Sequence, residues 1–165
     1  MIKPYFSFNL KNDKDFVSRV YFHLKRQPGI DDVFFFAELN AEQRISEEVI
    51  KAIKEATHFV FFHGSEVFDY QTKEAHIWES TQRKSTFIVK STNPADPSET
   101  IGDFENDIAP MKDVWTSGGP ESSEREAVNC AKKLAEKIVQ TWVPFDGLPD
   151  QYIFDYEKTI IEEFT

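Results

Sequence analysis

The sequence has few of the features that mark secreted, membrane or nucleic-acid-binding proteins. Cys130 is its single cysteine, which excludes an internal disulfide, and 29 acidic residues outnumber 19 basic ones to give a formal net charge of −10. Nucleic acids and anionic membranes attract clustered Lys and Arg, so we expect neither as a partner. No apolar run approaches the roughly 18 residues that span a bilayer, and no secretory signal follows Met1. We therefore expect a protein of the reducing cytoplasm.

Motifs of common active sites are missing as well. The sequence contains no glycine-rich dinucleotide or P-loop fingerprint and no G-x-S-x-G nucleophile motif. Its four histidines and one cysteine lack the spacing of metal ligands, so we expect no metal site. His58 and His63 flank an apolar run and are interpreted as structural. Cys130 falls among apolar residues at helical spacing, which indicates packing rather than a nucleophile.

The sequence does contain the material for a large apolar core. It has 165 residues, the size of one domain, and sixteen of them are phenylalanine. Short apolar runs predict strands, and apolar residues at helical spacing between these runs predict helices. The predicted strands cover 4–8, 33–36, 58–62, 86–89 and, most weakly, 114–115, and the predicted helices cover 16–24, 45–56, a segment that includes 74–79, and 123–142.

This alternation predicts an α/β fold, specifically a flavodoxin-like doubly wound sheet of five parallel strands in the order 2-1-3-4-5 with helices on both faces. The runs at 33–36 and 58–62 are apolar at successive positions, which is typical of strands covered on both faces. Ser123, followed by Glu126, is interpreted as a capping box at the start of the last helix. We expect the domain to span 1–142, and 143–165 to form an extra helix or a connector to a further domain or partner.

Glu74 is the residue best placed for chemistry. It follows the buried run 58–62 and a short loop, and ligands of parallel α/β sheets bind at the carboxyl ends of the strands. We predict that Glu74 lies on the first turn of the next helix, where the positive end of the helix dipole would keep it ionised. The alternative is that Glu74 belongs to a solvated helix face, which is common in a chain this acidic.

Several residues near the predicted strand ends are candidate ligand contacts. The candidates are an aromatic slot of Phe8, Phe34 and Phe36, polar contacts from Asn9 and Arg44, and a stacking ring from Tyr70, one helical turn before Glu74. The alternative for the three phenylalanines is the apolar core, and the alternative for Arg44 is an ordinary surface charge.

Three motifs follow one another along the chain. The first is Phe-Ser-Phe at 6–8, the second joins the run at 33–35 to the helical segment 45–53, and the third joins the run at 59–62 to Asp-Tyr-Gln-Thr-Lys-Glu at 69–74. Over residues 1–142 this order resembles a TIR (Toll/interleukin-1 receptor) domain of the bacterial NAD⁺-cleaving type. The third motif is similar to the aromatic-x-x-x-Glu signature of that family, with Tyr where Trp is usual.

The resemblance implies an NAD⁺ glycohydrolase or ADP-ribosyl cyclase that releases nicotinamide, with Glu74 as the catalytic residue, NAD⁺ as substrate and no further cofactor. It also implies self-association through TIR–TIR contacts, an activating domain or partner protein, and a role in antiviral defence or cell-death signalling. Two alternatives stay open. One is a non-catalytic scaffold that assembles through the loop 37–44, and the more distant one is a nucleoside deoxyribosyltransferase-like enzyme with a glutamate as covalent nucleophile.

Overall fold

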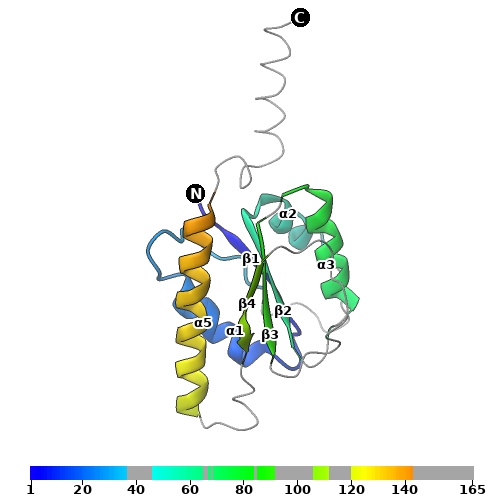
Figure 1. Cartoon of the computed structure of the whole chain (residues 1–165). Coiled ribbons are helices and arrows are strands. Elements are labelled where there is room, and N and C mark those ends of the chain that lie inside the picture. Colours follow the sequence, from blue (N-terminus) through cyan, green and yellow to red (C-terminus); the bar gives the residue numbers. More distant parts are fainter. Residues whose placement is uncertain are drawn as a thin grey trace, which may run out of the picture.

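A parallel sheet lies between two layers of helices in the computed structural model, which confirms the predicted α/β class (Figure 1). Among the described residues the sheet has four strands in the order β1-β2-β3-β4, and all neighbouring strands are parallel. The strands are β1 (Pro4–Ser7), β2 (His58–His63), β3 (Thr86–Ser91) and β4 (Asn106–Met111). The structure describes residues 1–36, 46–64, 67, 69–83, 85–91, 106–111 and 120–142.

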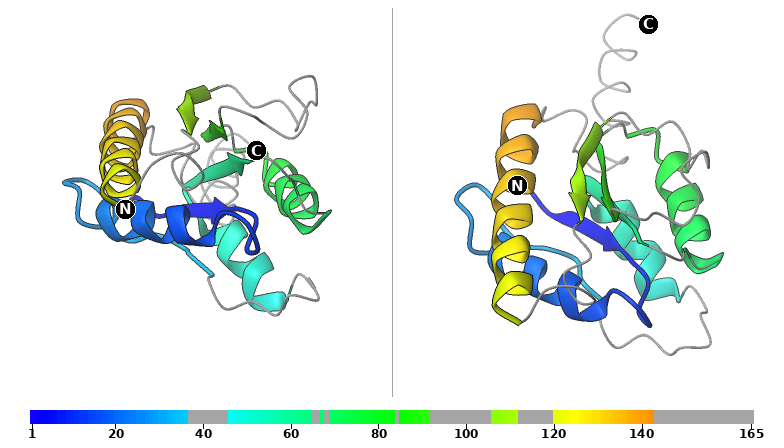
Figure 2. Two further views of the ribbon diagram at one scale, coloured as in Figure 1. Left: turned by 90° about the horizontal axis from the view of Figure 1, so that it is seen from below. Right: turned by 60° about the horizontal axis from the view of Figure 1, so that its bottom comes forward.

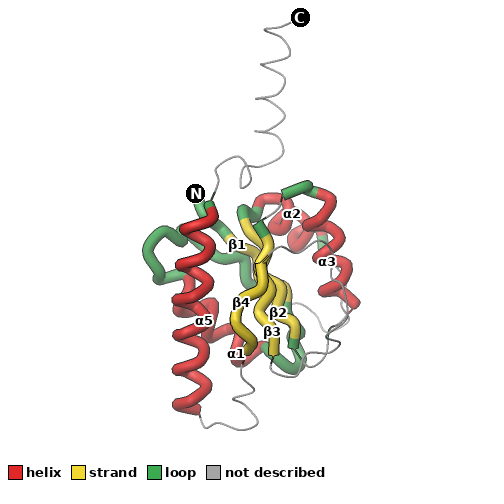
Figure 3. Tube along the Cα trace, in the orientation of Figure 1, coloured by secondary structure: helices red, strands yellow, loops and turns green. Residues whose placement is uncertain are grey.

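The helices cover both faces of the sheet. Helices α1 and α5 lie side by side on one face, and α2 and α3 cover the other (Figure 2). Figure 3 shows the same layers coloured by type of element. None of the helices in the described ranges is both long enough and apolar enough to cross a membrane. The bounds are α1 (Lys14–Leu24), α2 (Glu47–Glu55), α3 (Asp69–Ser80) and α5 (Pro120–Thr141).

Two helix starts follow directly from the sequence. The Ser46 hydroxyl precedes α2 and accepts a hydrogen bond from the Val49 N–H at 3.2 Å, which satisfies one of the first free N–H groups of the helix. Helix α5 begins at Pro120, whose fixed φ and missing N–H suit the first helical position. The predicted capping box at Ser123 and Glu126 is therefore wrong, because both residues lie inside the helix.

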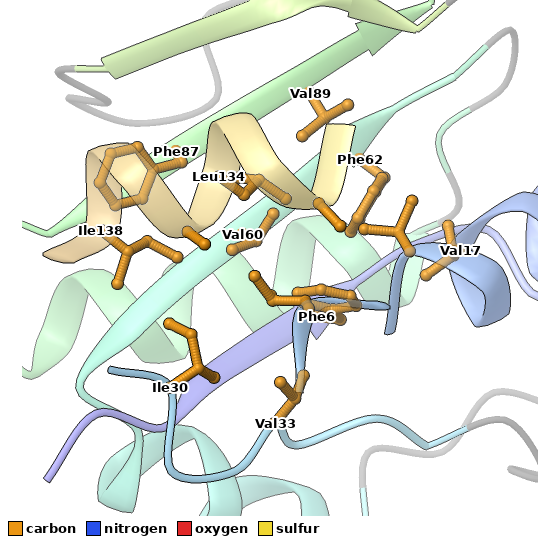
Figure 4. Packing of buried hydrophobic residues seen from close by; sticks show 14 of the residues in the cluster. Phe6, Val17, Ile30, Val33, Val60, Phe62, Phe87, Val89, Leu134 and Ile138 are labelled. Carbon is orange, nitrogen blue, oxygen red and sulfur yellow. The ribbon is translucent and has the colours of Figure 1, made fainter. Parts of the chain in front are cut away.

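Residues of β1 and β2 point alternately to the two faces of the sheet, and both faces are covered by apolar side chains. The prediction that 58–62 is covered on both faces is thus confirmed. The α1/α5 core includes Phe6, Val60, Phe62, Phe87 and Val89 from the strands with Val17, Leu134 and Ile138 from the helices (Figure 4). The α2/α3 core includes Tyr5, Phe59 and Phe61 from the strands with Val49, Ile53 and Trp78 from the helices.

The segment predicted as the second strand makes a single bridge. Phe34 pairs in parallel with Tyr5, and its N–H donates to the Pro4 carbonyl at 2.8 Å while its own carbonyl accepts from the Phe6 N–H at 3.0 Å. The Tyr5 backbone pairs with β2 on the other side. The segment 33–36 therefore runs along the edge of β1 that faces away from β2.

The last strand of the described residues lies at a place that the sequence did not predict. β4 covers Asn106–Met111, whereas the predicted strand at 114–115 lies outside the described residues, as does the extension at 143–165. Asn106, Asp107 and Pro110 all disfavour regular strand pairing, so the pattern of this segment gives no strand signal. The register between β3 and β4 shifts between Val89 and Ser91, opposite Pro110, where a proline can be accommodated.

Candidate active site

The loops after β1 and β2 meet at the carboxyl end of the sheet. From β1 the chain enters α1 on one face, and from β2 it enters α3 on the other face, so a topological switch lies between these two strands. Gly64 follows β2 and approaches Asp13, the residue before α1. A Cβ atom at Gly64 would lie 2.3 Å from Asp13 Oδ2, so a side chain at this position would force the Asp13 carboxyl group to move.

Asn9 shapes the loop between β1 and α1. Its Oδ1 accepts hydrogen bonds from the Lys11 N–H at 2.9 Å and the Asn12 N–H at 3.0 Å, and its carbonyl accepts from the Asp13 N–H at 2.9 Å. Asparagine suits such a turn because its side-chain oxygen imitates a backbone carbonyl. Asn9 is fully buried, so in this conformation it supports the loop and does not face solvent.

Glu74 lies on α3 with its side chain turned toward the sheet. Because α3 begins at Asp69, Glu74 belongs to the second turn of the helix. The prediction that Glu74 lies on the first turn is therefore wrong. Only 2% of the residue is exposed, so the alternative of a solvated helix face is also wrong. Glu79, on the same helix, is exposed, as expected of an acidic residue on a helix surface.

Two hydroxyl groups of β1 hold the Glu74 carboxyl group. The Tyr5 hydroxyl donates to Glu74 Oε2, and Ser7 Oγ donates to Glu74 Oε1 at 2.8 Å. Tyr5 and Ser7 are two residues apart in β1 and so point to the same face of the sheet, the face that α3 covers. Each carboxyl oxygen therefore has its own donor, and the two donors come from one strand.

Burial decides the ionisation of Glu74. Removal from water raises the pKa of this carboxyl group from 4.5 to about 7, although the hydrogen bonds from Tyr5 and Ser7 lower it. The prediction that the helix dipole keeps Glu74 fully ionised is therefore wrong, because the group is desolvated and one turn further from the helix start. Burial and the neighbouring Glu74 also raise the pKa of Tyr5, which keeps the phenol a neutral donor.

Tyr70 connects α3 to the loop that follows β1. It lies four residues before Glu74 and hence on the same side of the helix. Its hydroxyl donates to the Phe8 carbonyl and accepts from the Leu10 N–H at 2.8 Å. Tyr70 is 6% exposed, so in this conformation its ring is part of the protein interior and a ligand could stack on it only after the site opens.

The three phenylalanines of the predicted aromatic slot do not come together. Phe8 packs in the α1/α5 core and stacks on Phe35 at a centroid distance of 5.3 Å, whereas Phe34 and Phe36 are partly buried against the α2/α3 core on the other face. The ring of Phe36 lies 6.0 Å from the ring of Tyr5, one of the two partners of Glu74. Arg44 lies outside the described residues.

Sequence reasoning missed Tyr5 and Ser7 as partners of Glu74. The available signal was the pattern of β1, in which two hydroxyl-bearing residues alternate with apolar ones. Both hydroxyls then face one side of a strand that is buried on both sides, and buried polar groups are nearly always hydrogen-bonded. This pattern predicts that a polar partner exists but does not say which residue supplies it.

The two histidines and the cysteine considered in the sequence pack inside the protein. His58 is buried, with its ring 5.4 Å from the ring of Trp142, and burial lowers its pKa to about 4. His63 ends β2 and is also buried. Cys130 packs against the α1/α5 core, and burial raises the pKa of its thiol to about 12, which confirms the packing interpretation.

Within the described ranges, no group of three or more His, Cys, Asp or Glu side chains is arranged to hold a metal ion. No protein-family model matches the chain, and no curated protein matches it significantly.

Proposed function

We propose that this chain is a TIR-like domain that cleaves NAD⁺ and releases nicotinamide, with Glu74 as its catalytic carboxylate. The observation that carries the proposal is the position of Glu74, a buried carboxyl group beside the switch point of a parallel sheet, with both oxygens held by hydroxyls of β1. Strongly shifted carboxyl groups concentrate at functional sites. The three sequence motifs support the same assignment, because the third of them ends at Glu74.

The proposal includes a flavodoxin-like sheet of five strands in the order 2-1-3-4-5 within residues 1–142. In this arrangement the segment 33–36 is the edge strand next to β1. The bridge between Tyr5 and Phe34 supports the order, because it lies on the edge of β1 away from β2.

Cleavage of NAD⁺ requires little from the protein beyond one carboxylate. Nicotinamide leaves the cationic ring of NAD⁺ as a neutral molecule, so the reaction needs no proton donor for the leaving group, unlike ordinary glycoside hydrolysis. A carboxylate beside the ribose stabilises the oxocarbenium-like transition state. An ionised carboxylate has about four acceptor positions, of which Tyr5 and Ser7 use two, so Glu74 can also accept from ribose hydroxyls.

The proposed reaction also requires a change in access. Glu74 is 2% exposed in the single chain, so NAD⁺ reaches it only when substrate binding or self-association uncovers the carboxyl group. In the proposal, a second copy completes the active site in response to an activating domain or partner protein. The expected setting is the cytoplasm, in antiviral defence or cell-death signalling. Among the predicted contacts, Phe36 and Arg44 are proposed to meet the substrate, while Asn9, Tyr70 and Phe8 shape its surroundings.

A non-catalytic scaffold is the second candidate, and one observation favours it. The hydrogen bonds of Glu74 and Tyr70 both join α3 to β1 and its loop, which is also what a purely structural pair of anchors would do. A scaffold of this kind would self-associate without consuming NAD⁺.

The two candidates differ in one measurement. Concentrated protein is incubated with NAD⁺, and nicotinamide release is followed for wild type, Glu74→Gln and Glu79→Gln. We expect release by the wild type, a loss of at least about 100-fold in Glu74→Gln because the transition-state charge is no longer stabilised, and no change in Glu79→Gln, which alters an exposed carboxylate of the same helix.

Circular dichroism of each variant separates a lost activity from a lost fold. Absence of release at every wild-type concentration, with self-association preserved, would favour the scaffold. Release that persists in folded Glu74→Gln would contradict the role of Glu74.

A further inference from the structure

We infer that Tyr5 is a positioning residue for Glu74: its phenol fixes the orientation of the carboxyl group and favours the charged form that the reaction uses. This inference rests on the proposed function and adds a residue that the sequence motifs did not indicate.

The Tyr5 ring is held on several sides. It is 1% exposed, it stacks on Phe59 at a centroid distance of 5.8 Å with an interplanar angle of 9°, and it lies 6.0 Å from Phe36. Phe59 in turn stacks on Trp78 of α3 at 5.6 Å. The ring therefore has little freedom to rotate, and its hydroxyl is a fixed donor.

The backbone of Tyr5 is equally constrained. Tyr5 is paired with Phe59 of β2 on one edge of β1 and forms the bridge to Phe34 on the other edge. Ser7 contributes the second donor from the same strand and is fully buried. Because the two donors bind different oxygens, they fix the plane of the Glu74 carboxyl group as well as its position.

The hydrogen bonds also affect the charge of Glu74. Burial favours the neutral acid, and the bonds from Tyr5 and Ser7 oppose it, with the larger effect coming from Tyr5. The titratable groups that interact with Glu74 include Tyr5 from β1 and Tyr70 from α3. Asp13, in the loop after β1, acts in turn on Tyr70. None of these groups carries a positive charge that would stabilise the carboxylate. The hydrogen bonds from Tyr5 and Ser7 are the interactions that favour its charged form.

Replacing Tyr5 with Phe keeps the ring and removes only the donor. A hydrogen bond to a charged group is worth enough to shift a carboxyl pKa by about one to two units. We expect the acid limb of the pH–rate profile of nicotinamide release to move up by that amount. The rate of Tyr5→Phe should fall about tenfold at neutral pH and recover above about pH 9. Ser7→Ala should show a smaller shift in the same direction.

Tyr21→Phe is the matched control. Tyr21 lies on α1, its ring stacks on Phe35 at 4.6 Å, and its hydroxyl is bonded by Lys25 Nζ at 3.4 Å, away from the site. This variant should keep the wild-type pH profile. A Tyr5→Phe profile that is unchanged would overturn the inference, and so would a loss that is equal at every pH, since that result indicates general disruption.

A second readout works without any catalysis. In protein labelled with ¹³C at the glutamate carboxyl carbon, the Glu74 signal is identified by its absence in Glu74→Gln and is titrated in wild type and Tyr5→Phe. The wild-type midpoint should lie near pH 7 and the variant midpoint about one to two units higher. A moved midpoint without NAD⁺ cleavage would refute the proposed function and leave Tyr5 as the residue that sets the charge of Glu74. Cleavage with an unmoved midpoint would refute the inference alone.

Discussion

The helices on the two faces of the sheet are held by different kinds of contact. On one face, α1 and α5 pack against the sheet through apolar side chains such as Val17, Leu134 and Ile138. On the other face, α3 contributes Trp78 to an apolar core but is also joined to β1 and its loop by the polar groups of Tyr70 and Glu74. Burying a carboxyl group is unfavourable compared with burying a hydrocarbon. The buried carboxyl group on the α3 face therefore lowers the stability of the fold at the place where the sheet topology favours a ligand.

The largest expected effect on stability belongs to the apolar face. Leu134→Ala removes a fully buried side chain and leaves a cavity between α5 and the sheet, so unfolding free energy should fall by about 2–5 kcal/mol. Urea denaturation at several pH values measures it, and the loss should be nearly the same at each pH because no titratable group is involved. A strongly pH-dependent loss would contradict the prediction that the contacts of Leu134 are purely apolar.

The second prediction concerns the pH dependence of stability, to which the two faces contribute with opposite signs. The folded-state pKa of Glu74 is raised from 4.5 to about 7, so its contribution to stability is present below pH 4.5 and is lost as the pH rises toward 7. The folded-state pKa of His58, on the α1/α5 face, is lowered from 6.5 to about 4, so its contribution is present above pH 6.5 and is lost as the pH falls toward 4. Each change amounts to about 3 kcal/mol.

Single substitutions should separate the two trends. Relative to wild type, Glu74→Gln should become progressively more stable as the pH rises from 4.5 to 7, whereas His58→Asn should become progressively more stable as the pH falls from 6.5 to 4. Chemical denaturation across this range measures both. If the unfolding free energies of wild type and a variant change in parallel with pH, the replaced group has the same pKa in the folded and the unfolded chain.

The smallest expected effect tests the polar anchor at the start of α3. Tyr70→Phe leaves the Leu10 N–H and the Phe8 carbonyl without the phenol, at a cost of about 1–3 kcal/mol. Hydrogen exchange at the Leu10 amide should accelerate, while Tyr21→Phe should leave it unchanged. Equal protection of Leu10 in wild type and Tyr70→Phe would mean that the loop after β1 is held by other contacts.

The sequence predicted those parts of the fold whose signal is local. The run at 58–62 was recognised because apolar residues occupy successive positions, and all of its residues are indeed buried. The helical spacing of Ala131, Leu134 and Ile138 predicted α5. β4 was missed because Asn106, Asp107 and Pro110 break the pattern that reveals a strand. Its position depends instead on pairing with β3, which no local window contains.

The candidate site shows the same division. Glu74 was found because it follows a buried strand, but its partner Tyr5 lies 69 residues away and belongs to another element. Its pKa was predicted in the wrong direction for a related reason. The effect of a helix end can be judged from neighbouring residues, whereas desolvation depends on everything that packs around the group in the folded chain.

The close approach of Gly64 to Asp13 limits how this chain can vary. Even alanine would place a carbon atom 2.3 Å from Asp13 Oδ2, and Asp13 is the residue from which α1 starts. Substitution at position 64 therefore displaces the side chain of the residue that precedes α1, although that residue lies in another loop. The loop after β2 can lie this close to the Asp13 carboxyl group in the present conformation because residue 64 has no side chain.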